Sequence, residues 1–380
     1  MKVLIIPTWY PNGEDKLMGR YHKEFCEELN NHGIDADMIF IDRQRFKKPL
    51  KYLFMKKWEV LEEINYKVYI KKMLNVSKIS YDLMMNIYVK KLDSAFKKYL
   101  STNSKPDVLH AMVTSPAGYA ACKLGKKYNI PVVVTEHSSV IKRFFGDGEL
   151  KKYGDYVLKN STFTTVSYYM KKYILNYTDT CYVLPNLVKT EVFNNNLQRK
   201  IDGRFNLVSV CALREGKNID VAFKAIKKLV RSGINIHYDI IGEGFKESYY
   251  RKCAKDIGVD KYVSFLGKKD KSEISEIFKS EHALIISSNL ETFCIPGVEA
   301  LASGMPVITT DCMGPTEYID ESNGLICMVD DDEDMARAIL ELYENYNKYD
   351  ADILRERARK FSSDEVVKKA KKLYKKVVGK

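Results

Sequence analysis

The chain has 380 residues, of which 45% are hydrophobic and 29% charged, and its formal net charge is +12. This length exceeds what one hydrophobic core usually serves, so we expect two domains, and no apolar run approaches the roughly 18 residues that a membrane-spanning helix needs. The eight cysteines are scattered without a Cys-x-x-Cys pair, which argues against a disulfide framework and a zinc site and favours reduced thiols in the cytoplasm.

The first half of the chain alternates predicted strands and helices. Lys2–Pro7 is expected to form a buried strand, because this apolar run is too short for a signal peptide and is broken by proline. A predicted helix over residues 21–31 stops at Gly33, a usual helix end, and residues 36–41 form the next strand. Three further strands are expected at residues 107–112, 131–135 and 163–166. This alternation predicts a Rossmann-like sheet.

A long basic and aromatic segment, residues 43–98, interrupts the alternation and is expected to be mostly helical. The whole excess of positive charge lies in its half of the chain: residues 1–190 hold 31 Lys and Arg against 19 Asp and Glu, whereas residues 191–380 hold 31 of each. Lysines interleaved with aromatic side chains favour contact with an anionic membrane surface. A solvated lysine face and an RNA-binding surface are the alternatives, and we expect no nucleic acid partner.

The second half repeats the alternation after a polar loop. Residues 194–200 predict that loop, and we place the domain boundary at residues 188–204. The expected strands are 205–211, 236–241, 261–266, 282–286, 307–310 and 325–328, and the expected helices are 221–230, 334–346 and 363–378. The acidic run 330–334 invites a divalent-metal interpretation, but it directly precedes a helix, where the helix dipole stabilises acids, so we interpret it as a helix start.

The most distinctive stretch joins two of these strands. An apolar run at 283–286 leads through Glu291 and Glu299 to a second run at 306–310, and Pro296 suits the first turn of a helix between them. Such units build parallel sheets that bind ligands at the carboxyl ends of their strands. The helix N-terminus attracts an anion, whereas ionised carboxylates accept hydrogen bonds from hydroxyls. A ligand with a diphosphate, a ribose and a second polyol is a nucleotide sugar.

Two glutamates eight residues apart, followed by Ala-Leu-Ala-Ser-Gly-Met-Pro-Val-Ile, resemble the donor-site signature of retaining family 4 glycosyltransferases, the type that builds bacterial capsule and cell-wall polysaccharides. Matching elements occur along most of the chain. The resemblance implies an α/β protein of the GT-B fold, with two Rossmann-like domains and an interdomain cleft. The N-terminal acceptor-side domain would span 1–188 and the C-terminal donor domain 204–360, with a final helix at 361–380 that packs back on the N-terminal domain.

The resemblance also assigns roles in the second half. Glu299 would hold the ribose diol, and Glu291 would hold the sugar together with the backbone of Phe293, Cys294 and Ile295. Arg214 and Lys217 resemble the family's pair of cations, which hold the donor diphosphate and neutralise the departing nucleoside diphosphate. The family usually has a glycine just before its arginine, whereas Leu213 stands there in this chain. The resemblance to the family's pair of cations is therefore better for Lys217 than for Arg214.

In the first half, Gly19 would let the backbone approach the donor from the loop after the first strand. Trp9 and Tyr10 in the same loop either stack on an acceptor or pack within the loop. His137 follows the strand at 131–135 and matches the family's histidine near the donor sugar. We therefore predict Glu291, His137, Arg214 and Lys217 as the catalytic group, with no metal and no cofactor beyond the nucleotide sugar itself.

These features predict a retaining hexosyltransferase that moves a sugar from a nucleotide sugar, expected to be a UDP-sugar, to a glycan or polyprenyl-linked acceptor in bacterial surface polysaccharide synthesis. The expected location is the cytoplasm or the inner face of the cell membrane. The alternatives are a nucleotide-sugar epimerase of the same fold, a pyridoxal-dependent sugar phosphorylase, and a non-enzymatic nucleotide- or RNA-binding protein. The sugar, the base and the linkage depend on a few pocket contacts that the sequence leaves open.

Overall fold

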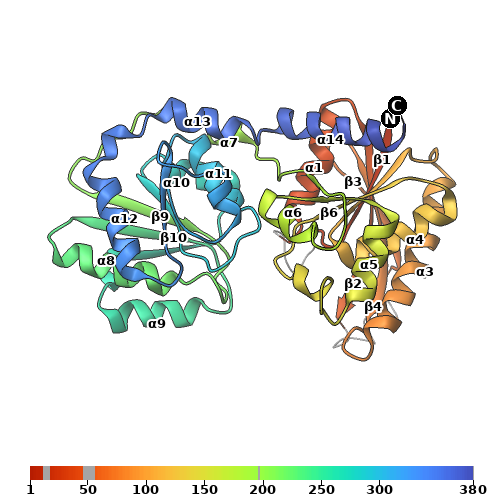
Figure 1. Ribbon diagram of the computed structural model, residues 1–380, viewed down its shortest axis with the longest axis horizontal. Helices are drawn as coiled ribbons and strands as arrows, with labels where there is room; N and C mark the ends of the chain where they lie inside the picture. Colours follow the sequence, from red (N-terminus) through yellow and green to blue (C-terminus); the bar gives the residue numbers. More distant parts are fainter. Residues whose placement is uncertain (12–17, 46–55, 196, 380) are drawn as a thin grey trace. The chain divides into compact units, whose positions relative to one another are not determined.

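The computed structural model describes residues 1–11, 18–45, 56–195 and 197–379. The chain divides into two compact units, each built around its own sheet (Figure 1). Unit 1 is Met1–Pro185 with Val366–Lys380, and unit 2 is Asn186–Glu365. The chain therefore changes unit at residue 186, and its last helix belongs mainly to the unit that contains its first strand.

Unit 1 holds an eight-stranded sheet in the order β3-β4-β2-β1-β5-β6-β7-β8, in which all neighbours except β3 and β4 run parallel. The strands are β1 (Lys2–Pro7), β2 (Asp35–Arg45), β3 (Trp58–Glu62), β4 (Lys67–Asn75), β5 (Val108–Met112), β6 (Val132–Glu136), β7 (Thr162–Thr165) and β8 (Tyr182–Val183). The helices are α1 (Arg20–Asn31), α3 (Tyr81–Leu100), α4 (Tyr119–Tyr128), α5 (Lys151–Asn160), α6 (Tyr168–Ile174) and the returning α14 (Ser363–Val377). The central strands are nearly continuous apolar runs because helices cover both faces of such a sheet.

The prediction that residues 43–98 are mostly helical is wrong. The described part of this segment holds the end of β2, the antiparallel pair β3 and β4, and the first part of α3. β4 pairs with β2 over eight residue positions, from Met38↔Val68 to Arg45↔Asn75, so the pair extends the parallel sheet at its edge. Residues 46–55 of the segment lie outside the described residues.

Unit 2 holds a six-stranded sheet, entirely parallel, in the order β11-β10-β9-β12-β13-β14. Its strands are β9 (Phe205–Val210), β10 (Ile236–Ile241), β11 (Val263–Gly267), β12 (Ala283–Ile286), β13 (Val307–Thr310) and β14 (Gly324–Cys327). Its helices are α7 (Thr190–Phe193), α8 (Ile219–Arg231), α9 (Glu247–Ile257), α10 (Lys271–Phe278), α11 (Ile295–Ala302), α12 (Asp332–Glu344) and α13 (Ala351–Arg359). The strand order reverses between β9 and β12, and in such sheets ligands bind at the carboxyl end of this switch point.

The acidic run at 330–334 begins α12, as its interpretation as a helix start predicts. The Asp331 side chain accepts hydrogen bonds from the backbone N–H groups of Glu333 and Asp334, at 3.0 and 2.9 Å. These two donors lack partners within the helix, so Asp331 satisfies them as an N-cap. Across the described residues, no helix is both long and apolar enough to cross a membrane.

Candidate functional site

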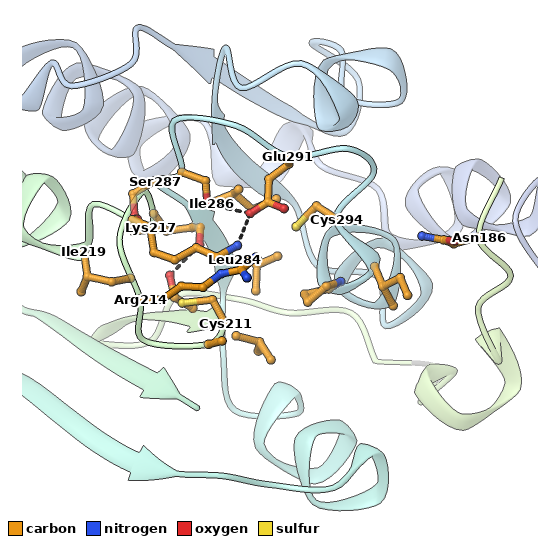
Figure 2. A pocket seen from close by; sticks show the side chains of 17 residues that line it. Asn186, Cys211, Arg214, Lys217, Ile219, Leu284, Ile286, Ser287, Glu291 and Cys294 are labelled. Carbon is orange, nitrogen blue, oxygen red and sulfur yellow. Dashed lines mark hydrogen bonds and ion pairs between the residues drawn. The ribbon is translucent and has the colours of Figure 1, made fainter. Parts of the chain in front are cut away.

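A cavity of about 320 Å³ lies at the carboxyl ends of β9 and β12 in unit 2. Residues Ser209 to Ala212 line it from the end of β9, and Leu284 to Ser288 line it from β12 and the loop that follows. Arg214, Lys217, Glu291, Cys294 and Ile295, all predicted site residues, also line it (Figure 2). The fold thus brings together two loops whose predicted functions are complementary, although they lie more than 70 positions apart in the chain.

Lys217 and Glu291 face one another across this cavity and form an ion pair (Figure 2). The two side chains are only 12% and 14% exposed, respectively. Ser288 donates a second hydrogen bond, of 2.7 Å, to the same Oε1 atom of Glu291. Burial lowers the pKa of Lys217, but the negative charge of Glu291 and its hydrogen bond outweigh burial and raise the pKa overall. Lys217 is therefore an ammonium ion held in a partly desolvated pocket.

The loop that carries Lys217 is tied to the loop that carries Glu291. Ser287 donates a 2.7 Å hydrogen bond to the carbonyl oxygen of Lys217, and the N–H of Asn289 donates to the carbonyl oxygen of Gly216 at 2.9 Å. Arg214 lies earlier in the same loop and is exposed, with its guanidinium at the cavity (Figure 2). The pocket therefore holds one largely buried and one solvated cation, both on a loop whose position is fixed by hydrogen bonds.

Glu299 lies in α11, is 3% exposed, and follows the cavity-lining residue Pro296 by about one helical turn. Its Oε1 atom is 3.5 Å from the Nζ of Lys271, the first residue of α10. The start of α10 is fixed by a capping box, in which Asp270 and Glu273 each bond the other's backbone N–H. The predicted ribose ligand is therefore a buried carboxylate whose charge is offset by a lysine from a different helix.

The turn into α11 has an unusual backbone. Cys294 adopts a φ of +66°, a left-handed conformation that residues other than glycine rarely adopt, and Pro296 fills the first turn. The Tyr318 hydroxyl donates to the carbonyl oxygens of Phe293 and Cys294, at 3.1 and 2.8 Å. Gly314 lies so close that a Cβ there would be 2.5 Å from the carbonyl carbon of Thr292. These contacts hold the backbone of residues 293–295, whose side chains include buried Phe293.

Two predicted site residues lie in unit 1, and each is described within that unit. The ring of His137 lies 5.2 Å from the ring of His22 and 5.0 Å from the ring of Tyr21, both on α1. Gly19 has a φ of +75°, and a Cβ there would lie 2.4 Å from the carbonyl oxygen of Trp9, so only glycine fits this turn. Residues 12–17, which belong to the same loop between β1 and Gly19, lie outside the described residues.

Trp9 and Tyr10 differ in their burial within unit 1. Tyr10 is 3% exposed, packs against Phe40 at a ring distance of 5.7 Å and donates a hydrogen bond to Glu63. This environment is that of a loop-packing residue. Trp9 is partly exposed and stacks on His22 at 6.3 Å.

Sequence reasoning missed several polar residues of the pocket. Ser288, which bonds Glu291, and Ser209 at the end of β9 carry no motif of their own. Lys271, which pairs with Glu299 outside the cavity lining, lies 28 positions before it, and only the fold brings the first residue of α10 to Glu299. Asn186 lines the cavity from the first residue of unit 2. A signal existed for Ser288 alone, because it lies three positions before Glu291 in the distinctive stretch.

Family models match the two halves of the chain separately. The model described as Glycosyltransferase Family 4 matches residues 18–192, and the model described as Glycosyl transferases group 1 matches residues 194–361. Among curated proteins, the chain is 27% identical to an uncharacterized glycosyltransferase, MJ1178, of Methanocaldococcus jannaschii, over 70% of this chain and 75% of that protein. It is 26% identical to Protein CapJ of Staphylococcus aureus, over 57% of this chain and 58% of CapJ.

Solved structures share the fold. Sucrose-phosphate synthase of Thermosynechococcus elongatus superimposes with a TM-score of 0.78 at 15% identity, over 100% of both chains. HepE of Anabaena, in complex with UDP-glucose, superimposes with a TM-score of 0.71 at 15% identity, over 98% of this chain and 99% of HepE. The predicted fold class, GT-B with two Rossmann-like domains, is thereby confirmed. With glycosyltransferase models matching both halves, the chain is a glycosyltransferase of the GT-B fold that resembles family 4.

Proposed function

We propose that this glycosyltransferase takes a nucleotide sugar, with UDP as the nucleotide, and transfers the sugar with retention to a glycan or polyprenyl-linked acceptor in bacterial surface polysaccharide synthesis. The observation that carries the donor part is the largely buried pair of Lys217 and Glu291 inside the cavity at the switch point of the unit 2 sheet. A cation for phosphate and a carboxylate for hydroxyls lie there side by side.

The donor diphosphate is proposed to bind Lys217 and Arg214. Lysine acts as a point charge, whereas arginine grips phosphate with two parallel hydrogen bonds. The pocket excludes most water from Lys217, so its ammonium group stabilises negative charge more strongly than a solvated lysine. As the glycosidic bond breaks, negative charge builds up on the departing nucleoside diphosphate. The ammonium group therefore stabilises the transition state more than the bound donor, and this difference lowers the barrier.

Glu291 and Glu299 are proposed to hold the two polyols. When phosphate attracts Lys217, Glu291 gains capacity to accept hydrogen bonds from sugar hydroxyls, while Ser288 keeps the carboxylate oriented. Glu299 would accept hydrogen bonds from the ribose diol, and the ammonium group of Lys271 lies 3.5 Å from its Oε1 atom. The backbone of residues 293–295, fixed by Tyr318, would complete the sugar site.

Retention is proposed to follow from attack by the acceptor on the face from which the leaving group departs. A covalent intermediate needs a free carboxylate nucleophile at the anomeric carbon. Glu291 is the one carboxylate among the described residues that line the cavity, and it is paired with Lys217 and hydrogen-bonded by Ser288. A carboxylate held in this way is a poor nucleophile.

His137 is proposed to act on the sugar from unit 1.

Relatives support the donor and the biological role. The structures of Anabaena HepE contain UDP, UDP with glucose, or UDP-glucose. The amylovoran biosynthesis glycosyltransferase AmsK of Erwinia amylovora is 26% identical over 41% of this chain and 40% of AmsK. A polysaccharide acceptor at a membrane also suits the basic excess of residues 1–190.

Isothermal titration calorimetry of UDP, GDP and ADP against the wild-type protein and Glu299→Gln tests the donor site. We expect UDP to bind best, and Glu299→Gln to weaken UDP about 10- to 100-fold, which corresponds to the ~1.5–3 kcal/mol of a hydrogen bond to a charged group. Glu344→Gln, at the last residue of α12, is the control and should leave binding unchanged. Equal UDP affinity in Glu299→Gln and Glu344→Gln would show that Glu299 does not contact the nucleotide. If the wild-type protein bound none of the three nucleotides, the proposed donor site would be wrong. The anomeric configuration of the product, read by NMR, tests retention.

A further inference from the structure

A tryptophan at the edge of the unit 1 sheet is surrounded by lysines. Trp58 begins β3 and lies opposite Lys71 of β4 in the antiparallel pair. The Nζ atoms of Lys71 and Lys98 lie 5.9 and 4.6 Å from the centroid of the Trp58 ring, both positioned over it. Burial and the positive charges of Lys91, Lys98 and Lys57 lower the pKa of Lys71. We call Trp58 with these four lysines the Trp58 cluster.

Three of the four lysines in this cluster have no acidic partner in the part of the chain that the structure describes. Among the described residues, no ion pair joins Lys71, Lys91 or Lys98 to a carboxylate. Neighbouring lysines on the same elements do have such pairs: Lys72 lies 3.1 Å from Glu59, and Lys97 lies 3.6 Å from Asp93. Like charges held together repel one another, so an arrangement that leaves them unneutralised favours an anionic partner.

An exposed apolar side chain beside the cluster indicates what kind of anion the cluster meets. Val60 shares a face of β3 with Trp58, because alternate residues of a strand point the same way, and it is 42% exposed. Leu83 and Ile79 are 46% and 68% exposed, but they lie at the other end of α3 from Lys98, about 22 Å along the helix, and so are not beside the cluster. α3 packs beside β4, so its lysines and this strand edge form one surface. Tryptophan, lysine and an exposed aliphatic group suit the headgroup layer of a membrane.

The geometry is less suited to RNA. Binding of single-stranded nucleic acid by aromatic residues needs an open ring face on which a base can stack. Two lysine ammonium groups already lie over the Trp58 ring, so a base would have to displace them. A phosphate group needs only the ammonium groups themselves, and the indole can remain at the boundary between headgroups and acyl chains.

We propose that the Trp58 cluster is the surface by which this protein docks on an anionic membrane, with the lysines binding phospholipid phosphates and Trp58 lying among the headgroups. The inference deepens the proposed function and rests on it, because a polyprenyl-linked acceptor lies in a membrane. It replaces a basic helix, which the sequence suggested, with a sheet edge and one face of α3. The donor pocket is in the other unit, so docking and donor binding can be tested separately.

The test is flotation of the full-length protein with phosphatidylcholine vesicles, with and without phosphatidylglycerol. The variant Lys71→Gln/Lys91→Gln/Lys98→Gln removes three charges of the cluster. Lys224→Gln/Lys255→Gln/Lys261→Gln, on unit 2, changes the net charge equally and is the control. We expect the wild type and the control to float with anionic vesicles only, and the cluster variant to bind them at least about tenfold more weakly, given what each lysine near an anionic surface contributes. Thermal melting confirms that both variants are folded.

A second measurement uses Trp58 as the reporter. The chain has two tryptophans, so Trp9→Phe leaves Trp58 as the only one. Its emission should shift to shorter wavelength on anionic vesicles and be quenched by lipids brominated near the headgroup. Equal flotation of cluster and control variants, or an unchanged Trp58 emission on bound vesicles, would overturn the proposal, as would binding to poly-uridylate in preference to vesicles. UDP binding without vesicle binding would refute the docking surface alone, and vesicle binding without UDP binding would refute the donor site alone.

Discussion

At the scale of single residues, the pair of Lys217 and Glu291 explains how the pocket stays stable without a ligand. A buried charge that loses its partner is costly, because little water remains to solvate it. Each residue of the pair compensates the other until a diphosphate and a sugar arrive and offer replacement contacts to both. Donor binding thus exchanges one set of ionic contacts for another, which keeps its net cost low and makes the Lys217 charge available to the leaving group.

Glu281 is a buried carboxyl group that no proposed function uses, and it makes stability depend on pH. It is 3% exposed, and its Oε2 atom has no hydrogen-bond partner among the described residues. Burial, followed by the charge of Asp239, raises its pKa from an ordinary 4.5 to about 8. The folded protein therefore holds the Glu281 proton more tightly than the unfolded chain does. The resulting penalty is absent below about pH 4.5 and grows as the pH rises toward 8.

We expect Glu281→Gln to raise the free energy of unfolding at pH 8 by about 4 kcal/mol, because the amide carries no charge to desolvate, and to change it little at pH 4.5. Urea unfolding across this pH range measures the effect. Glu276→Gln on α10, whose side chain is 69% exposed and 2.5 Å from Lys279, is the control and should stay within about 0.5 kcal/mol of the wild type at every pH. A pH-independent difference for Glu281→Gln would contradict the assigned pKa.

At the scale of elements, α14 is attached to unit 1 by a buried hydrogen bond to β5. The Tyr374 hydroxyl lies 2.6 Å from Nδ1 of His110, whose Nε2 lies 2.7 Å from the Thr135 hydroxyl. Burial, with a smaller contribution from His137, lowers the pKa of His110 to about 3. His110 is therefore neutral in the folded protein at neutral pH. Its contribution to stability is complete above about pH 6.5 and declines as the pH falls from there toward 3.

We expect Tyr374→Phe to lower the free energy of unfolding at pH 7 by about 1–3 kcal/mol, because it leaves a buried ring nitrogen of His110 without its partner. Chemical denaturation of the full-length protein measures the loss. Tyr182→Phe removes an exposed hydrogen bond, of 2.8 Å, from Lys376 of the same helix and serves as the control. A loss of equal size in the control would show that the hydroxyl of Tyr374 has no special role.

Most elements could be predicted from local patterns. The strands 2–7, 236–241 and 307–310 have the predicted bounds, because each is a compact apolar run between polar loops. The pair β3 and β4 was missed because its alternation is irregular: Trp58-Glu-Val-Leu-Glu62 mixes apolar and charged residues on both faces, and Leu61 is 39% exposed. What makes β4 a strand is its pairing with β2, a long-range contact that local propensity does not reveal.

The candidate site was predictable where one loop carried a motif and was missed where packing created the contact. Glu291, Glu299 and Lys217 lie in recognisable sequence motifs that directly follow predicted strands. The Lys271 partner of Glu299 comes from α10, and nothing near Lys271 in the chain marks it apart from the start of a helix. Arg214 lines the pocket although the residues before it depart from the family's pattern, because the loop after β9 reaches the cavity at several positions, from Cys211 to Lys217.

At the scale of the whole molecule, the chain has two cores that are linked twice. It leaves unit 1 after Pro185 and returns with Val366. The core of unit 2 is a cluster of buried residues contributed by β9, α8, β10, β12 and α12, with no residue of α14 among its described members. The apolar residues of α14, in contrast, are buried in unit 1: Val366, Val367, Ala370 and Tyr374 are each at most 1% exposed. Unit 1 therefore depends on α14, whereas the core and pocket of unit 2 do not.

Deleting residues 363–380 should consequently destabilise unit 1 while leaving the donor pocket intact. Removal of α14 exposes several buried apolar side chains, and the burial of each contributes about 1.5–3 kcal/mol to the free energy of unfolding. The loss for unit 1 should therefore be about 5 kcal/mol or more, which is on the order of its full stability. In calorimetry of the truncated chain, we expect the unfolding transition of unit 1 to disappear or to move to lower temperature. UDP should raise the unfolding temperature of the remaining transition, that of unit 2, because a ligand stabilises only the unit that binds it. Removing Gly379 and Lys380 alone is the control. A truncated chain without a UDP-sensitive transition would contradict the prediction, because it would mean that the pocket of unit 2 is lost together with α14.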